Sequence, residues 1–435
     1  MLFDPRVIFI SLWTIELVAQ FLFGGIFGSF ANETWGVIAI TIIAFLLGAQ
    51  LIESKVDHSV VDKINLIKQI ERFFAKNVSS GFIYITLLLF VIAAFFAIQK
   101  LFIITGVDST VLRPPECLRL KIIHDLISDR EIAPILKLFT FGIAICIFYL
   151  SDVKNSTKFQ IYFIIVLGLF FVFATTGRLM LLMLFSAVTY LLYMQKAWGL
   201  KEIFFSVVSF VLLFFIIAIA LNKQTADWSK NINPCTSKNC IVQEIFWQNT
   251  KTQIINKRSQ SSTSNVLTIQ DKLVWNAQNY LMGSLAAFNH FVATGSPSIE
   301  GGATLPNIIR KAINLTGANV KMRPAVNPYV ITPLQSNTYT AIFPIYHDMG
   351  KLGVLVWFFM LGILHQFLYK LSQFSAASIY KYFYAISIYP LCMIIFEEAY
   401  ISSLGFWAIF LVTPALLQLL NIGWAKLVMF QAEKK

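Results

Sequence analysis

Long apolar runs alternate with short polar segments along the chain, and one long polar interval interrupts this pattern. A membrane-spanning helix needs about 20 mostly apolar residues. The runs lack an alternation of period two, so helices are predicted rather than the strands of a barrel. The ten predicted spans are 7–26, 35–52, 81–99, 134–150, 159–175, 179–194, 203–221, 352–369, 382–399 and 404–424.

We therefore predict an all-α protein, a polytopic membrane helix bundle of about ten transmembrane helices. One large periplasmic loop separates the seventh helix from the eighth. Residues 1–221 then form a first bundle of about seven helices, 222–351 the large loop with short helices, and 352–435 a second bundle of about three helices. Within the loop, 272–293 has apolar residues at helical spacing, which predicts an amphipathic helix on the bundle or the bilayer surface.

Composition and charge agree with a membrane protein. Apolar residues make up 57% of the chain and charged residues 13%, against about 45–50% and about 25% in soluble domains. Loops on the side of the N-terminus hold fifteen Lys and Arg, and short loops on the other side hold six. The positive-inside rule therefore favours cytoplasmic termini. The segment 100–133, with five basic residues on the outer side, weakens this orientation.

The large loop is strongly basic. Between Asn222 and Thr338 there are eleven Lys and Arg against four Asp and Glu, a net +7 of the chain's +12. Such a surface suits an anionic ligand, namely phosphate, pyrophosphate, an acidic sugar or a lipid headgroup. A solvated basic loop near anionic lipid is the alternative. Arg258, Arg310 and Arg323 are the arginines of this loop and candidates for binding substrate.

Arg178 is a candidate catalytic cation. The predicted fifth and sixth spans meet at Ala174–Leu179 without room for a loop, so the chain reverses at the outer surface with Arg178 at the apex. A guanidinium fixed on two packed helices suits phosphate oxygens. The alternative is an interfacial arginine that extends to lipid headgroups.

Two acidic or acid–base pairs are further catalytic candidates. His347 and Asp348 end the large loop, where they offer a base and an acid at the outer surface. The alternative is that this stretch is an interfacial aromatic belt with a polar helix start. Glu397 and Glu398 end the ninth predicted span, where they could orient or deprotonate a sugar hydroxyl or anchor the arginines of the loop. The alternative is that both are solvated at the level of the lipid headgroups. The polar residues Asn337, Tyr339, Tyr346 and His290 are candidates for substrate binding.

Three other features leave alternatives open. Glu16 lies near the middle of the first span, where acids are costly and face the bundle or a wet cavity. Cys235 and Cys240 in the large loop form a disulfide if it faces an oxidising compartment, or remain thiols. The spacing of these cysteines is not that of a metal site, and we predict neither a metal nor a cofactor.

Three stretches resemble bacterial O-antigen polymerases, the Wzy-type oligosaccharide repeat unit polymerases. They are the segment NTYTAIFPIYHDMGKLGVLVWFFMLGIL, the turn at Gly177–Arg178 and the stretch NYLMGSLAAFNHF. Arg178 matches the arginine of the family's helix turn. The matches to the polar stretch before its eighth span are Asn337, Tyr339, Tyr346, Asp348 and Gly350. An Arg followed ten residues later by Gly, seen in some members, does not occur after Arg258, Arg310 or Arg323.

The resemblance implies a metal-independent glycosyl transfer at the periplasmic face of the inner membrane. Its substrates are undecaprenyl-pyrophosphate-linked oligosaccharide repeat units, its leaving group is the lipid pyrophosphate, and its product is O-antigen or a related surface polysaccharide. Its partners are then the bilayer and a polysaccharide chain-length regulator, and not a nucleic acid.

Other functions remain open at this point. An O-antigen ligase, which transfers finished polymer to the lipid A core, has a similar architecture. A lipid-linked oligosaccharide transporter is an alternative from another class, but it predicts internal repeats and charges spread through the membrane interior. A non-enzymatic scaffold is a third, and it would tolerate the loss of Arg178.

Overall fold

The fold is described from a computed structural model of the chain. The described residues are 2–56, 65–74, 80–105, 129–151, 158–174, 178–210, 269–296, 299, 302–322, 327–328, 330–332, 335–336, 338–375, 377–401 and 403–433. Arg258, Arg323, Asn337, Cys235 and Cys240 lie outside them, as does the side chain of Arg178.

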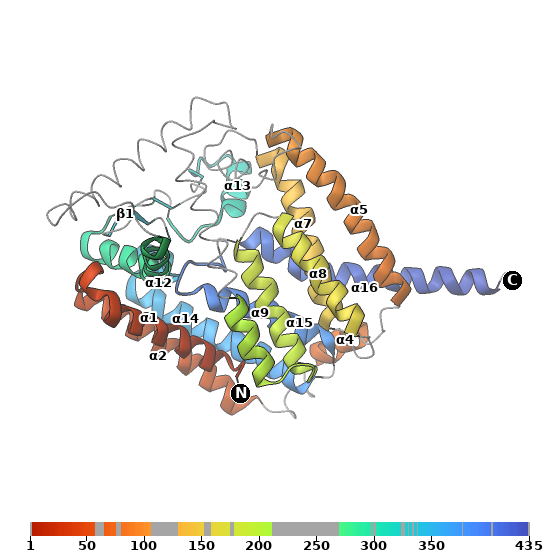
Figure 1. The fold of residues 1–435 in the computed structure, drawn as a ribbon, viewed down its shortest axis with the longest axis horizontal. Coiled ribbons are helices and arrows are strands. Elements are labelled where there is room, and N and C mark those ends of the chain that lie inside the picture. The colour runs from red at the N-terminus through yellow and green to blue at the C-terminus, as the bar shows by residue number, and fades with distance from the viewer. Residues whose placement is uncertain are drawn as a thin grey trace.

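Apart from one antiparallel pair of two-residue strands, the described elements are helices (Figure 1). They are α1 (Pro5–Phe27), α2 (Asn32–Lys55), α4 (Asn65–Phe74), α5 (Ser80–Thr105), α7 (Asp129–Ser151), α8 (Lys158–Ala174), α9 (Arg178–Met194), α12 (Ile269–Thr294), α13 (Asn307–Leu315), β1 (Val330–Ile331), β2 (Gln335–Ser336), α14 (Ile342–Phe374), α15 (Ser378–Met393) and α16 (Leu404–Glu433).

Six helices in the described part of the chain are long and apolar enough to cross a membrane. They are α1, α2, α5, α7, α14 and α16, while α8 and α9 are apolar but shorter. The helical, membrane-type fold predicted from the apolar runs is therefore confirmed. Among the described residues six candidate spans are found where ten were predicted for the chain, and the seventh predicted span, 203–221, is described only over its helical residues 203–210.

Helices α1, α2 and α14 lie side by side and share one hydrophobic core with α12 (Figure 1). Phe9 of α1 stacks on Phe45 of α2 with ring centroids 3.9 Å apart, and Phe358 of α14 lies against the same ring of Phe9. Local sequence sets the limits of α1. Asp4 caps its first turn ahead of a proline, and Gly28 ends it with a φ of 77°.

A second core lies among α5, α7, α8, α9, α15 and α16. Aromatic residues fill its centre, and Tyr149, Tyr190 and Tyr382 are completely buried there. The hydroxyl of Tyr190 donates to Ser372 of α14 at 2.7 Å. This hydrogen bond joins the second core to α14, which also contributes residues to the first core.

The closest helix contact is between α2 and α14, which run parallel. A Cβ atom built on Gly48 would stand 2.1 Å from the carbonyl oxygen of Phe359, and one built on Gly362 would stand 2.1 Å from that of Phe45. Backbones approach this closely only where a glycine leaves room. Each glycine presents its α-hydrogen to a carbonyl oxygen of the other helix, the geometry of a Cα–H···O contact.

Helix α14 begins ten residues before the predicted start of its span at residue 352, at Ile342. Pro344 does not prevent this, because the N–H groups of a first helical turn have no partner within the helix. Gly350 then interrupts the helix with φ 61° and ψ −158°. The bend predicted from the glycines and proline here is confirmed, but it lies inside the helix.

Helix α15 ends at Met393, six residues earlier than the predicted limit of 399. Pro390 lies in its last turn and supplies no N–H to the helix. Glu397 and Glu398 consequently lie in the turn between α15 and α16 rather than at the end of a span. The predicted amphipathic helix at 272–293 is confirmed as α12, which packs on α1 and α2.

Candidate functional site

Polar residues from three parts of the chain that are distant in sequence meet at one end of the bundle, which we call the loop end. It contains the beginnings of α2 and α14 and the last turns of α12. Asn289 of α12 accepts hydrogen bonds from Ala31 N at 2.9 Å and Thr34 Oγ1 at 2.8 Å, which fixes α12 to the beginning of α2. Ala341 N donates to Ile394 O at 2.8 Å and so brings the turn after α15 to the beginning of α14.

The carboxylate of Asp348 binds the loop that precedes α13. Its oxygens accept from Ala303 N at 2.8 and 2.9 Å, from Thr304 N at 2.7 Å and from Thr304 Oγ1 at 2.6 Å. Gly302 precedes these residues with a φ of 88°, and a Cβ there would stand 2.9 Å from Asp348 Oδ2. A glycine is therefore required where the loop meets the carboxylate.

His347 uses both ring nitrogens beside Asp348. Its Nδ1 lies 2.6 Å from Asp348 Oδ1, and Ile299 N donates to its Nε2 at 3.2 Å. With Nε2 accepting from the main chain, Nδ1 is the ring nitrogen that faces the carboxylate of Asp348. Phe291 stacks on the ring with centroids 5.5 Å apart. His347 and Asp348 thus fasten Ile299 and residues 302–304 to α14.

Arg310 is completely buried and fastens the same loop from its other side. Its guanidinium donates to Gly302 O at 2.6 Å, Leu305 O at 2.8 Å and Lys321 O at 2.6 Å. Five donors in a fixed fork suit such a set of carbonyls. The sequence marked Arg310 as an anion ligand, and the structure places its guanidinium on main-chain oxygens.

The two tyrosines of this stretch have different surroundings. The hydroxyl of Tyr339 donates to Pro328 O at 3.0 Å, and burial raises the pKa of this phenol to about 12. Tyr346 donates to Glu33 of α2 at 2.6 Å, and Lys351 forms an ion pair with the same carboxylate at 3.1 Å. His290 is half-buried on α12, one residue after Asn289.

The remaining catalytic candidates are placed by the turn after α15 and by α9. The carboxylate of Glu398 accepts from Tyr400 N at 2.6 Å and Ile401 N at 2.7 Å within that turn. The rings of Tyr190 and Tyr384 lie 4.9 Å apart, and Gln373, next to the last residue of α14, donates to Met194 Sδ at the end of α9. Helix α9 therefore ends where α14 ends, and its first residue, Arg178, lies toward the loop end.

One buried histidine, His365, was not among the residues predicted from the sequence. His365 of α14 is completely buried, and its Nε2 lies 2.8 Å from the hydroxyl of Tyr400. The available signal was a histidine within an apolar span. This contact holds the turn that contains Glu398 against the later half of α14.

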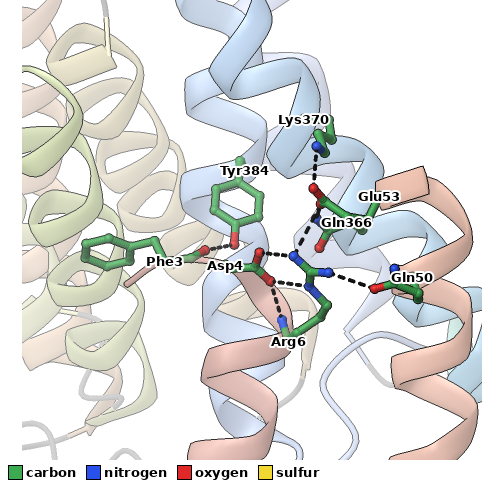
Figure 2. Close-up of polar contacts among 8 residues, drawn as sticks. All are labelled: Phe3, Asp4, Arg6, Gln50, Glu53, Gln366, Lys370 and Tyr384. Carbon is green, nitrogen blue, oxygen red and sulfur yellow. Dashed lines mark hydrogen bonds and ion pairs between the residues drawn. The ribbon is translucent and has the colours of Figure 1, made fainter. Parts of the chain in front are cut away.

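A second polar cluster, also missed from sequence, joins α1, α2 and α14 at the opposite end of the bundle (Figure 2). Arg6 contacts Asp4 at 2.6 Å and Glu53 at 3.3 Å, and Lys370 contacts Glu53 at 2.7 Å. A cavity of about 430 Å³ borders these four residues. Burial of Asp4 alone would raise its pKa, but hydrogen bonds and charge from Arg6 outweigh burial and lower it.

Comparison with known proteins identifies no family whose model matches this chain, and no curated protein or solved structure that is significantly similar to it. The site therefore has to be interpreted from its own geometry.

Proposed function

We propose that this protein polymerises lipid-pyrophosphate-linked oligosaccharide repeat units at the periplasmic face of a bacterial inner membrane. One observation carries the proposal. His347 and Asp348 lie near the beginning of α14, the turn with Glu398 is joined to that beginning through Ile394, and α9 begins at Arg178 on the side away from the end of α14. A lipid-linked substrate reaches such a place sideways from the bilayer.

The proposed reaction transfers a growing glycan to a new repeat unit. A hydroxyl oxygen of the acceptor forms a bond to the anomeric carbon of the donor, and the bond from that carbon to the lipid pyrophosphate breaks. The lipid pyrophosphate leaves with the bonding electron pair, so a cation must stabilise its developing charge. Arg178 has this role in the proposal.

The acceptor proton requires a base within hydrogen-bond reach. Glu397 and Glu398 are carboxylates in the turn held against the beginning of α14, and Glu398 would have to receive the proton while its Oε1 accepts from Tyr400 N and Ile401 N. His347 is the other base in the proposal, and it must first release the N–H of Ile299 from its Nε2. Asp348 and Arg310 hold residues 302–304 and shape the acceptor side of the site.

The test is a gel of surface polysaccharide from cells with and without the gene. Loss of the polymer ladder, leaving core with a single repeat unit, supports the polymerase. Bare lipid A core with long polymer accumulating on the carrier lipid indicates a ligase instead. An unchanged ladder refutes both and favours a transporter of other substrates.

Single substitutions then locate the site. Arg178→Ala and His347→Ala should preserve membrane insertion and abolish polymer. The matched control is Arg72→Ala, which removes an exposed arginine of α4 at the opposite end of the bundle and should leave the ladder intact. Wild-type polymer from Arg178→Ala or His347→Ala would remove that residue from the proposed site.

A further inference from the structure

A carboxylic acid lies inside the bundle at the midpoint of α1. Glu16 is 1% exposed and stands midway between Pro5 and Phe27, about 16 Å from either end at the helical rise. Neither of its oxygens has a hydrogen-bond partner within the described part of the chain. Glu16 is therefore a polar group that the packing of α1 leaves unsatisfied.

Gln20 adds a third oxygen on the same face, one turn further along α1. Its Nε2 donates to Gly28 O at 3.2 Å, which orients the amide, and its buried Oε1 has no partner among the described residues. Side chains four residues apart on a helix are neighbours, so these three oxygens can face one ligand. The buried Nε1 of Trp13, on the preceding turn, is a donor and cannot ligate a cation.

No described counter-charge approaches Glu16 from the helices packed on α1. These helices are α2, α12, α14 and α15. Lys381 stands in the first turn of α15 at the opposite end of the bundle, and His290 near the end of α12 at the loop end. Lys55 stands in the last turn of α2, also at the opposite end, and the side chains of Asp271 and Lys272 lie outside the described residues. The other described acids, bases and histidines of these helices are paired elsewhere: Glu33 with Lys351, Glu53 with Lys370, His347 with Asp348, and His365 with Tyr400.

An ionised carboxylate without a counter-charge is strongly unfavourable in an apolar interior, and it is stable there only when neutralised or bound to a cation. We propose that Glu16 and Gln20 form an intramembrane site for one monovalent cation, a proton or a sodium ion. A proton on Glu16 would be donated to Gln20 Oε1, which satisfies both groups. A sodium ion would take the two carboxyl oxygens and the amide oxygen as ligands.

The first test measures thermal unfolding of the purified full-length protein in detergent at pH 7. Sodium chloride is compared with choline chloride at equal ionic strength. A sodium site raises the melting temperature with sodium in wild type, because a ligand that binds only the folded state stabilises it. Glu16→Gln abolishes that response. Glu33→Gln, which removes a solvent-exposed acid paired with Lys351, is the matched control and keeps it.

The second test distinguishes the proton from sodium by infrared spectroscopy of the same samples. The difference spectrum between wild type and Glu16→Gln should show the carbonyl stretch of a protonated carboxylic acid in choline chloride. A band that sodium removes identifies a site shared by both cations, and a band that sodium leaves unchanged identifies a proton site. Absence of both the band and the sodium response overturns the proposal.

A further variant keeps the proposal testable if Glu16→Gln does not fold. Gln20→Leu removes the amide oxygen and retains the acid. It should weaken the sodium response, or shift the carbonyl band to higher frequency because the acid loses its acceptor. If Gln20→Leu responds to sodium and absorbs like wild type, the site does not use Gln20 and the proposal fails.

Discussion

The contact between α2 and α14 can be tested by adding a single methyl group. In Gly362→Ala, the new Cβ would stand 2.1 Å from Phe45 O and 3.0 Å from Phe45 C. These neighbours belong to a helical backbone and cannot rotate away, so the helices must separate by about 1 Å. Overpacking of this kind costs roughly 1–3 kcal/mol, and we expect a value near the upper limit.

Gly48→Ala should behave alike, because its Cβ would stand 2.1 Å from Phe359 O. Once one methyl group has separated the helices, the second has more room. The double variant should therefore lose about 1 kcal/mol less than the sum of the single variants. Gly36→Ala on the same α2 is the matched control. Its Cβ would meet nothing within 4 Å, so it should be neutral or stabilising by up to about 1 kcal/mol.

The assay is equilibrium unfolding in mixed micelles with increasing sodium dodecyl sulfate, followed by tryptophan fluorescence. If Gly362→Ala and Gly48→Ala unfold at the same detergent fraction as Gly36→Ala, the two backbones are not in contact. Additive losses in the double variant would mean that the two glycines serve separate contacts.

Three more predictions concern the ends of the bundle. Gly302→Ala places a residue with a side chain at a φ of 88°, where its Cβ would meet the carboxylate of Asp348. The loss of about 2 kcal/mol of local stability should speed amide hydrogen exchange at residues 303 and 304 roughly 30-fold. Arg310→Met strips the donors from three main-chain carbonyls and should cost more than about 3 kcal/mol, with faster proteolysis within 302–322. Arg6 lowers the pKa of Asp4 in the folded protein below its ordinary value of 3.8. The ionised Asp4 therefore stabilises the folded protein at pH values above 3.8, and this stabilisation is lost as the pH falls through the lowered pKa. The melting temperature of Asp4→Asn should therefore lie below that of wild type at pH 7, and the difference should shrink on acidification. A difference independent of pH would contradict this linkage.

Local sequence determined most of the helices, because an apolar run of spanning length has one stable state in a bilayer. The predicted span 7–26 became Pro5–Phe27, with a proline and a glycine at its limits. The amphipathic spacing of 272–293 likewise predicted α12. These features depend on neighbours a few residues away, so composition and spacing suffice to predict them.

The candidate site was predictable as residue types and not as contacts. His347 and Asp348 were identified from their place before a span, but nothing local indicates that Ile299 and Ala303 bind them. Arg310 was marked for its charge, and only the fold directs its guanidinium to three carbonyls. These partners lie many residues away, and hydrogen bonds at such separation leave no periodic pattern in the sequence.

The sequence by itself determined that this chain forms apolar helices of spanning length and which segments between them are polar. Tertiary structure alone decided that Gly48 and Gly362 bring α2 and α14 into backbone contact, and that the predicted bend at Gly350 lies within α14 rather than before it. It also decided that Glu16 faces inward without a partner. The reason is physical, since hydropathy acts on each segment separately, whereas close packing and polar pairing depend on which segments meet.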